Sequence, residues 1–127
     1  MQQSSYILYK LGHYREALPY FDKALAIDPE SDTYDNRGSD FYKLGEYNQA
    51  LSSFNKAIEA NQYDDKAYYG KALTLEKIGL QTHDISAIQM AVQTLDKTLS
   101  IYSDNKDAQN LKSSLENILA WNRGQEN

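Results

Sequence analysis

Cysteine is absent from the 127 residues, which excludes disulfides and thiolate metal sites and favours a reducing compartment. Proline occurs only twice and glycine six times, so little interrupts regular structure. No stretch approaches about 18 consecutive apolar residues, so no membrane-spanning helix is predicted. A basic start followed by an apolar run is also missing, so we expect no secretory signal. These absences favour a cytoplasmic protein that does not insert into membranes.

Charge and motif content narrow the function further. The net charge is −5, whereas nucleic-acid binding draws on clustered Lys and Arg, so we expect no nucleic-acid partner. The two histidines, His13 and His83, are far apart in sequence, lack a Ser/Asp or Cys partner pattern and are predicted to face solvent. Neither a phosphate-binding glycine-rich loop nor a metal-ligand spacing occurs. The sequence therefore predicts no enzyme and no cofactor or metal site.

A repeated motif is the strongest signal in the chain. Lys10–Leu18 reads KLGHYREAL, Lys43–Leu51 reads KLGEYNQAL, and a fainter copy begins at Lys77. The glycines of the three copies, Gly12, Gly45 and Gly79, are separated by steps of 33 and 34 residues. A fixed period of this size indicates stacked helical hairpins, none of which can bury its apolar face alone. We expect the three glycines to occupy equivalent turns.

Apolar residues follow each turn at three- and four-residue steps, which predicts an amphipathic helix. In the first two units these residues are Tyr14, Ala17, Leu18, Phe21, Ala24, Leu25 and Ile27, and then Tyr47, Ala50, Leu51, Phe54, Ala57 and Ile58. Pro29 ends the first of these helices. The third unit has seven more residues than the second between its glycine and the matching alanine, Ala91. Seven residues are about two helical turns, so we predict a long second helix in this unit, with Asp84 or Thr82 as its N-cap.

A seventh helix is predicted after the third unit. Its apolar residues Ala108, Leu111, Leu115, Ile118 and Leu119 would face the stack, and a polar outer face would cap it. We expect a single domain over residues 1–122. Its parts are a first unit at 1–31, a second at 32–64, a third with the insertion at 65–105, and the capping helix at 106–122. Residues 123–127 are expected to form a disordered tail.

These positions resemble the tetratricopeptide repeat (TPR), a helix–turn–helix of about 34 residues. In the second unit the matching residues are Tyr34, Gly38, Phe41, Gly45, Tyr47, Ala50, Phe54 and Ala57. The first unit matches at Ser5, Leu8, Gly12, Tyr14, Ala17, Phe21, Ala24 and Pro29. The resemblance implies an all-α, right-handed superhelix in which the first helix of each unit lines a concave groove. It also implies a non-enzymatic adaptor that holds a peptide or partner helix there.

The groove positions can be counted along the first helix of each unit. The predicted peptide-binding residues are Tyr6, Tyr9, Lys10, Asn36, Tyr42, Lys43, Lys66, Tyr69, Leu73 and Lys77. Tyrosine offers a large contact area and a hydroxyl, although these rings also fit ordinary packing between helices. Lys10, Lys43 and Lys77 share one position in the three units and would form a positive strip favouring an acidic peptide or terminal carboxylate. The alternative is that Lys-Leu-Gly is simply the usual turn of this family.

Two further functions remain open. TPR co-chaperones hold a terminal carboxylate with five residues, of which only Asn36 and Lys66 have counterparts here, while Gly70 occupies the position of the Arg and the first unit offers Gln2 and Tyr6. In the other alternative the chain self-associates or stacks on a partner through its terminal helices, 1–11 or 108–121, with Trp121 as a contact.

Acidic pairs such as Asp32 with Asp35 and Asp64 with Asp65 are interpreted as helix caps at unit junctions.

Overall fold

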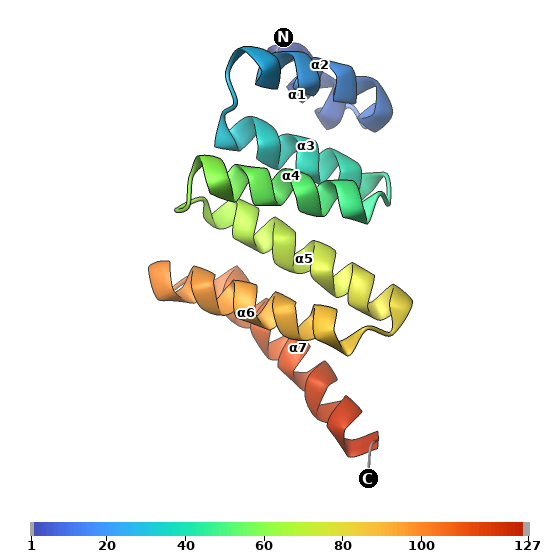
Figure 1. Ribbon diagram of the computed structural model, residues 1–127, viewed down its shortest axis with the longest axis vertical. Helices are drawn as coiled ribbons and strands as arrows, with labels where there is room; N and C mark the ends of the chain where they lie inside the picture. The colour runs from blue at the N-terminus through green and yellow to red at the C-terminus, as the bar shows by residue number, and fades with distance from the viewer. Residues whose placement is uncertain (1, 126–127) are drawn as a thin grey trace.

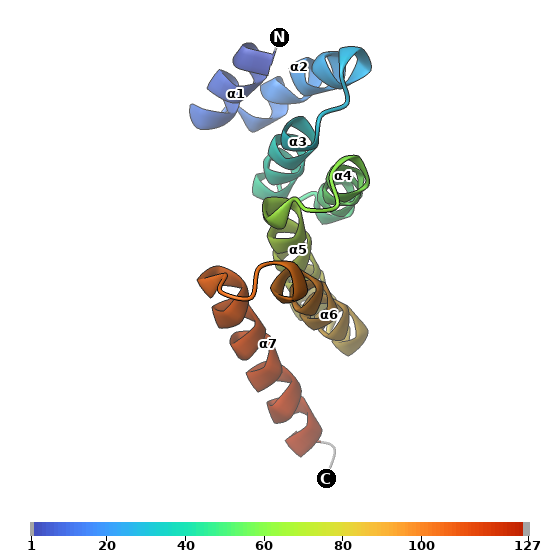
Figure 2. The same ribbon diagram turned by 90° about the vertical axis from the view of Figure 1, so that its left-hand side faces the viewer.

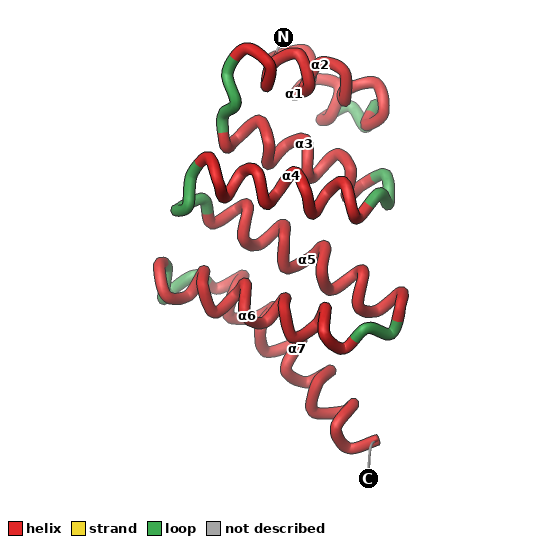
Figure 3. The backbone as a smooth tube through the Cα atoms, viewed as in Figure 1, coloured by secondary structure: helices red, strands yellow, loops and turns green. Residues whose placement is uncertain are grey.

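The structure is a stack of helices. The computed structural model describes residues 2–125 and the side chains of residues 4–125, and this part of the chain contains no strand. Its helices are α1 (Gln2–Lys10), α2 (Tyr14–Ile27), α3 (Ser31–Lys43), α4 (Tyr47–Ala60), α5 (Asp65–Thr82), α6 (Ile85–Ile101) and α7 (Lys106–Gln125). They succeed one another along the long axis of the molecule (Figure 1) and are joined by short loops (Figure 3). The predicted all-α superhelix is confirmed. None of the described helices has both the length and the apolar character needed to cross a membrane.

Glycine forms the turns of the first two hairpins, as predicted. Gly12 has φ +83° and Gly45 has φ +77°, a left-handed conformation that glycine adopts without strain. The backbone hydrogen bonds are equivalent as well. Gly12 N donates to Tyr9 O at 3.0 Å, and Gly45 N donates to Tyr42 O at 3.0 Å. The two copies of the motif therefore encode the same turn.

The third turn differs from the prediction. Gly79 is buried inside α5, and the left-handed residue of this turn is His83, with φ +55°. A Cβ on Gly79 would lie 2.6 Å from Ile88 Cδ1, so this glycine allows α5 and α6 to approach closely. Asp84 is the N-cap of α6, as predicted, and its side chain accepts from Ala87 N at 3.4 Å. The assignment of Gly79 to a turn was wrong because a glycine required for helix contact has the same sequence signature.

The insertion lengthens both helices of the third hairpin. Helix α6 has 17 residues against 14 in α4, which confirms the predicted long second helix. Helix α5 is also extended, to 18 residues against 13 in α3, which was not predicted. Ala91 remains fully buried, as Ala50 is in the preceding unit. The added residues are therefore divided between the turn ends of α5 and α6, and Ala91 keeps its place on the buried face.

Close helix contact depends on small residues. A Cβ added to Gly38 on α3 would lie 2.8 Å from the Phe54 ring, and one added to Gly70 on α5 would lie 2.4 Å from it. Phe54, on α4, is 3% exposed. One ring therefore contacts the first helix of its own unit and that of the next unit, and the spacing of α3 and α5 depends on the missing side chains.

Helix α7 covers the last hairpin, as predicted. Ala108 and Leu115 are fully buried, and Leu111, Ile118 and Leu119 pack against the same cluster. The helix continues to Gln125, so the predicted disorder of residues 123–125 is wrong; residues 126–127 lie outside the described part. Arg123 in the last turn has a favourable interaction with the helix dipole, which helps to explain the extension.

Asp40 is a buried acid between the first and second units. It lies on α3, its side chain is inaccessible to solvent, and no donor among the described residues hydrogen-bonds to its carboxylate oxygens. The nearest charges are Arg15 and Glu46, which form an ion pair with a separation of 2.6 Å. Burial raises the pKa of Asp40 to about 7, Arg15 opposes this shift and Glu46 adds to it. The folded protein therefore binds a proton at Asp40 more tightly than the unfolded chain.

The role of Gly79 can be tested by replacing it with alanine and making the same substitution at a second helical glycine, Gly124, as a control. Gly79→Ala should destabilise the fold by about 1–3 kcal/mol, because the new methyl group overpacks against Ile88. Gly124→Ala, in α7 with no atom near the added Cβ, should be neutral or stabilising by up to about 1 kcal/mol. Urea denaturation measures both. Equal stabilities of the two variants would show that α5 and α6 are not in close contact at Gly79.

The raised pKa of Asp40 predicts that the stability of the folded protein depends on pH. Its pKa is raised on folding, so its stabilising contribution is complete below the unfolded value of 3.8 and is lost as the pH rises through about 7. Asp40→Asn should therefore be more stable than the wild type at about pH 8, where the wild type carries a buried charge, and this advantage should shrink as the pH falls to about 4. Urea denaturation midpoints at the two pH values measure this difference, with the exposed Asp104→Asn as control. A stability difference that does not change with pH would contradict the assignment.

Candidate functional site

The first helices of the hairpins share one side of the stack. Figure 2 shows α1 and α7 projecting to one side of α3 and α5, with α2, α4 and α6 on the other side. Side chains three or four residues apart share one face of a helix, so one face of α3 and one face of α5 are directed toward the space between α1 and α7. This is the side on which the sequence predicts a groove.

A central pocket of about 350 Å³ lies on this side. Tyr9 comes from α1 and Phe54 from α4, and the other lining residues come from α3 and α5. Those residues are Asp35, Asn36, Ser39, Tyr42, Lys43, Lys66, Tyr69, Gly70 and Leu73. The structure thus brings together most of the predicted groove residues: Tyr9, Asn36, Tyr42, Lys43, Lys66, Tyr69 and Leu73.

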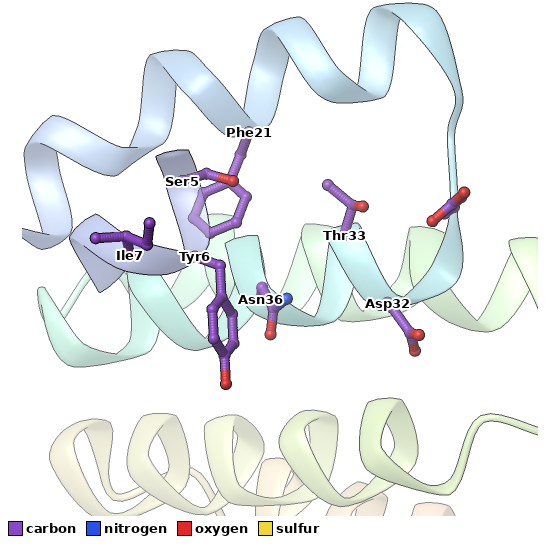
Figure 4. A pocket seen from close by; sticks show the side chains of 8 residues that line it. Ser5, Tyr6, Ile7, Phe21, Asp32, Thr33 and Asn36 are labelled. Carbon is purple, nitrogen blue, oxygen red and sulfur yellow. The ribbon is translucent and has the colours of Figure 1, made fainter. Parts of the chain in front are cut away.

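A second, N-terminal pocket of about 530 Å³ adjoins the first, because Asn36 lines both. Its other lining residues are Ser5, Tyr6, Ile7, Phe21, Glu30, Asp32 and Thr33. Figure 4 shows the Tyr6 ring and the Asp32 carboxylate extending to the same side, away from the α2 helix that carries Phe21. Predicted residue Tyr6, which is 48% exposed, therefore belongs to this pocket. The side chain of Gln2 lies outside the described residues.

Two groove tyrosines are fixed by an equivalent contact in successive units. Tyr9 and Tyr14 form an edge-to-face pair with ring centroids 5.5 Å apart, and Tyr42 and Tyr47 form the same pair at 5.5 Å. Such pairs stabilise ring orientation beyond simple burial. Tyr9 and Tyr42 are half-buried, so each ring packs within its hairpin and still presents part of its surface to the pocket.

The electrostatics of the central pocket are mixed. Lys43 and Lys66 are exposed ammonium groups. Burial raises the pKa of Tyr42 and of Tyr69, so both hydroxyls keep their protons. Burial also raises the pKa of Asp35 to about 9, and the neighbouring Asp64 adds to this shift. At neutral pH the pocket therefore carries two lysine charges and neutral hydroxyl and carboxyl groups, within an acidic protein.

The three lysines of the predicted strip have different surroundings. Lys43 lines the central pocket. The Lys10 ammonium lies over the Tyr6 ring, 5.3 Å from its centroid. Lys77 is half-buried, and its charge partly offsets the rise that burial causes in the pKa of Glu76. The continuous positive strip stays a prediction, and Lys43 and Lys66 are the cations at the pocket itself.

Sequence reasoning misassigned two acids and missed the role of one glycine. Asp64 caps α5, as predicted, and accepts from Ala67 N at 3.2 Å. Asp32 and Asp35, however, both lie within α3, whose N-cap is Glu30, so their interpretation as capping residues was wrong. Gly70, where the resemblance would place an arginine in a carboxylate clamp, lies against Phe54. No local sequence signal distinguishes a buried groove acid from a capping acid.

Comparisons with known proteins agree with this architecture. Family models described as tetratricopeptide repeat match residues 3–31 and 36–98. No curated protein matches the chain. The first TPR of Spaghetti (RPAP3), solved with the HSP90 peptide SRMEEVD, is 24% identical with a TM-score of 0.81, covering 94% of this chain and 90% of that chain.

Two other solved structures are similar. The second TPR domain of human RPAP3, solved with the HSP70 peptide SGPTIEEVD, is 20% identical with a TM-score of 0.79 and 90% coverage of both chains. The Arabidopsis OM64 TPR domain is 20% identical with a TM-score of 0.80 and 91% coverage of both. At these identities the likeness establishes the fold. Together with the family matches, which span most of the sequence, it shows that the chain belongs to the tetratricopeptide repeat family.

Proposed function

We propose that the groove formed by α1, α3 and α5 binds a peptide or helix of a protein partner, and that the chain acts as a non-enzymatic adaptor. TPR domains are protein-interaction modules, and two of the similar structures hold peptides. The observation that supports the proposal most is the composition of the central pocket. It combines three tyrosines, Tyr9, Tyr42 and Tyr69, with an amide and two lysines.

Each of these groups suits a polypeptide ligand. Half-buried tyrosines supply contact area and a hydroxyl, and they lose little conformational entropy on binding. Asn36 can both donate to and accept from a peptide backbone. Lys43 and Lys66 favour a ligand with acidic side chains, which their charges would attract and orient. We therefore propose an acidic segment as the partner, in the cytoplasm.

Recognition of a terminal carboxylate by the five-residue clamp is less favoured. Asn36 and Lys66 are present, but a side chain at Gly70 would collide with Phe54, so an Arg fits there only if that ring moves. A lysine does not reproduce the two parallel hydrogen bonds of an arginine. We propose that internal acidic side chains of the ligand contribute more to binding than its terminal carboxylate.

Selection from a random peptide library, followed by fluorescence anisotropy on the enriched peptides, tests the groove. Lys66→Glu should weaken binding about tenfold or more, because a repulsive charge replaces an attractive one. Lys56→Glu, on an exposed site of α4, is the matched control and should change affinity less than about twofold. Equal binding of each enriched peptide with a free and an amidated C-terminus is expected. If no peptide is enriched, or if Lys66→Glu binds as well as the control, the groove proposal is wrong.

Self-association through a terminal helix is a second candidate. Trp121 on α7 is 68% exposed, and Ile7 and Leu11 at the other end of the stack are 54% and 67% exposed. A large exposed aromatic ring at the end of a repeat stack suits contact with another copy. Sedimentation velocity should then show a concentration-dependent dimer that Trp121→Ser abolishes. Tyr63→Ser, which removes an exposed ring from the α4–α5 loop, should leave it intact. A monomer at all accessible concentrations would contradict this alternative.

A further inference from the structure

A hollow of about 240 Å³ lies between α5 and α6, and none of its lining residues belongs to the central or the N-terminal pocket. Helix α5 contributes Tyr68 and Lys71 to this outer hollow. Helix α6 contributes residues spaced three and four apart, and so on one face: Met90, Gln93, Thr94 and Lys97. Because α6 lies on the side of the stack away from α1 and α7 (Figure 2), a ligand bound here leaves the groove open.

The two lysines of the outer hollow have no carboxylate partner within the described chain. Neither Lys71 nor Lys97 takes part in an ion pair with a described residue. The acid next to Lys97 in sequence, Asp96, is paired with Lys112 of α7 at 2.7 Å. In a protein of net charge −5, two such ammonium groups at one hollow form a local positive site.

The preceding unit shows what a cation at this position binds. Arg37 on α3 precedes Lys71 by 34 residues, which is the repeat step between these two units. Its Nε donates to Asp22 Oδ1 at 2.8 Å, and its Nη1 donates to Ser53 Oγ at 2.9 Å. Arg37 is therefore neutralised by a carboxylate from α2, the second helix of the unit before, and is also bonded to a hydroxyl of α4.

The third unit keeps the hydroxyl of this arrangement and lacks the carboxylate. Thr94 corresponds to Ser53, because each lies three residues after the matched alanine of its unit, and it lines the outer hollow together with Lys71. Asn55 follows Asp22 by the repeat step of 33 residues, so α4 has an amide where α2 has an acid. A neutral amide cannot balance the charge of an ammonium group. The outer hollow thus has the cation of the preceding site without its acid.

The apolar surface beside the lysines distinguishes a polypeptide from a small anion. Met90 is 48% exposed at the hollow, and its flexible, polarisable side chain adapts to varied apolar partners. Gln93 carries amide donors and an acceptor that match a peptide backbone. A free inorganic anion would bind the lysines and leave Met90 exposed. The composition therefore favours an acidic segment that also carries an apolar side chain.

We propose that the outer hollow docks an acidic segment of a partner protein, with a carboxylate bound by Lys71 and Lys97 and a neighbouring apolar side chain packed on Met90. The carboxylate takes the place that Asp22 has beside Arg37 in the preceding unit. The proposal does not rest on peptide binding in the groove, because the two sites share no lining residue. A chain with both sites holds two segments at once, one on each side of the stack.

Peptide selection on Lys66→Glu, in which the groove carries a repulsive charge, tests the outer hollow. Enriched peptides should carry Asp or Glu beside an apolar residue and bind with a Kd of about 10–100 μM. In heteronuclear NMR spectra of the whole wild-type chain they should shift the amide signals of residues 90–97. Lys71→Glu should weaken binding about tenfold or more, because an attractive charge becomes repulsive. The matched control is Lys23→Glu, at the position of α2 that corresponds to Lys97, and it should change affinity less than about twofold.

A variant that supplies the missing acid gives a second test. Asn55→Asp places a carboxylate in α4 where α2 has Asp22, so the new acid should pair with Lys71 and weaken peptide binding about threefold or more. Asn48→Asp adds the same charge at an exposed position of the same helix and should change affinity less than about twofold. The difference between the two variants separates local pairing from general repulsion.

Several results would overturn the proposal. They are the absence of any enriched peptide, peptide-induced shifts confined to groove residues 36–43, and equal binding by Lys71→Glu and Lys23→Glu. Shifts of residues 90–97 that depend on protein concentration without peptide would assign the hollow to a second copy and would also overturn it. Signals of residues 36–43 report on the groove separately, so failure of one site leaves the other measurable. Should Lys71→Glu fail to fold by circular dichroism, the exposed Lys97→Glu provides the same test.

Discussion

The packing of Phe54 between Gly38 and Gly70 is the contact on which the groove depends. A Cβ at either glycine would fall within 3 Å of the ring, so two first helices, α3 and α5, lie as close to α4 as a side-chain-free backbone permits. The same two helices carry most of the residues of the central pocket, and the ring itself forms part of its floor. Because packed interiors resist small changes in volume, the spacing of the pocket walls follows from one aromatic ring and two missing side chains.

This packing limits the chemistry that the pocket can offer. The glycine at position 70 that allows α5 to approach Phe54 also removes the place from which an arginine could reach a ligand. Lys66 remains, but an ammonium is a point charge on a flexible stem and does not fix the orientation of a carboxylate. Orientation of the proposed ligand would therefore depend on the tyrosines, and two of them, Tyr9 and Tyr42, are held edge-on by the first residue of the following helix.

Sequence reasoning succeeded where repeats share a local cause. Gly12 and Gly45 stand in near-identical motifs and form the same turn, and several of the positions counted along successive first helices line one pocket. It failed where the cause is a contact between helices. Gly79 has the motif of a turn, yet Ile88 determines its role, and Asp35 resembles a capping acid until α5 brings Asp64 beside it. Local pattern specifies helices and repeated turns, whereas the contacts between helices depend on packing.

The insertion in the third unit is positioned so that it leaves the central pocket unchanged. The α5 residues that line this pocket run from Lys66 to Leu73, whereas the extension of α5 lies beyond the position matching the end of α3. The added turn of α5 instead packs on α6 through Gly79, and its outer side meets the Gly45 turn. There, Ile78, Gln81 and Thr82 line a separate hollow of about 300 Å³ with residues 45–49. Lengthening both helices at the turn end of the hairpin thus adds surface there, away from the residues that line the central pocket.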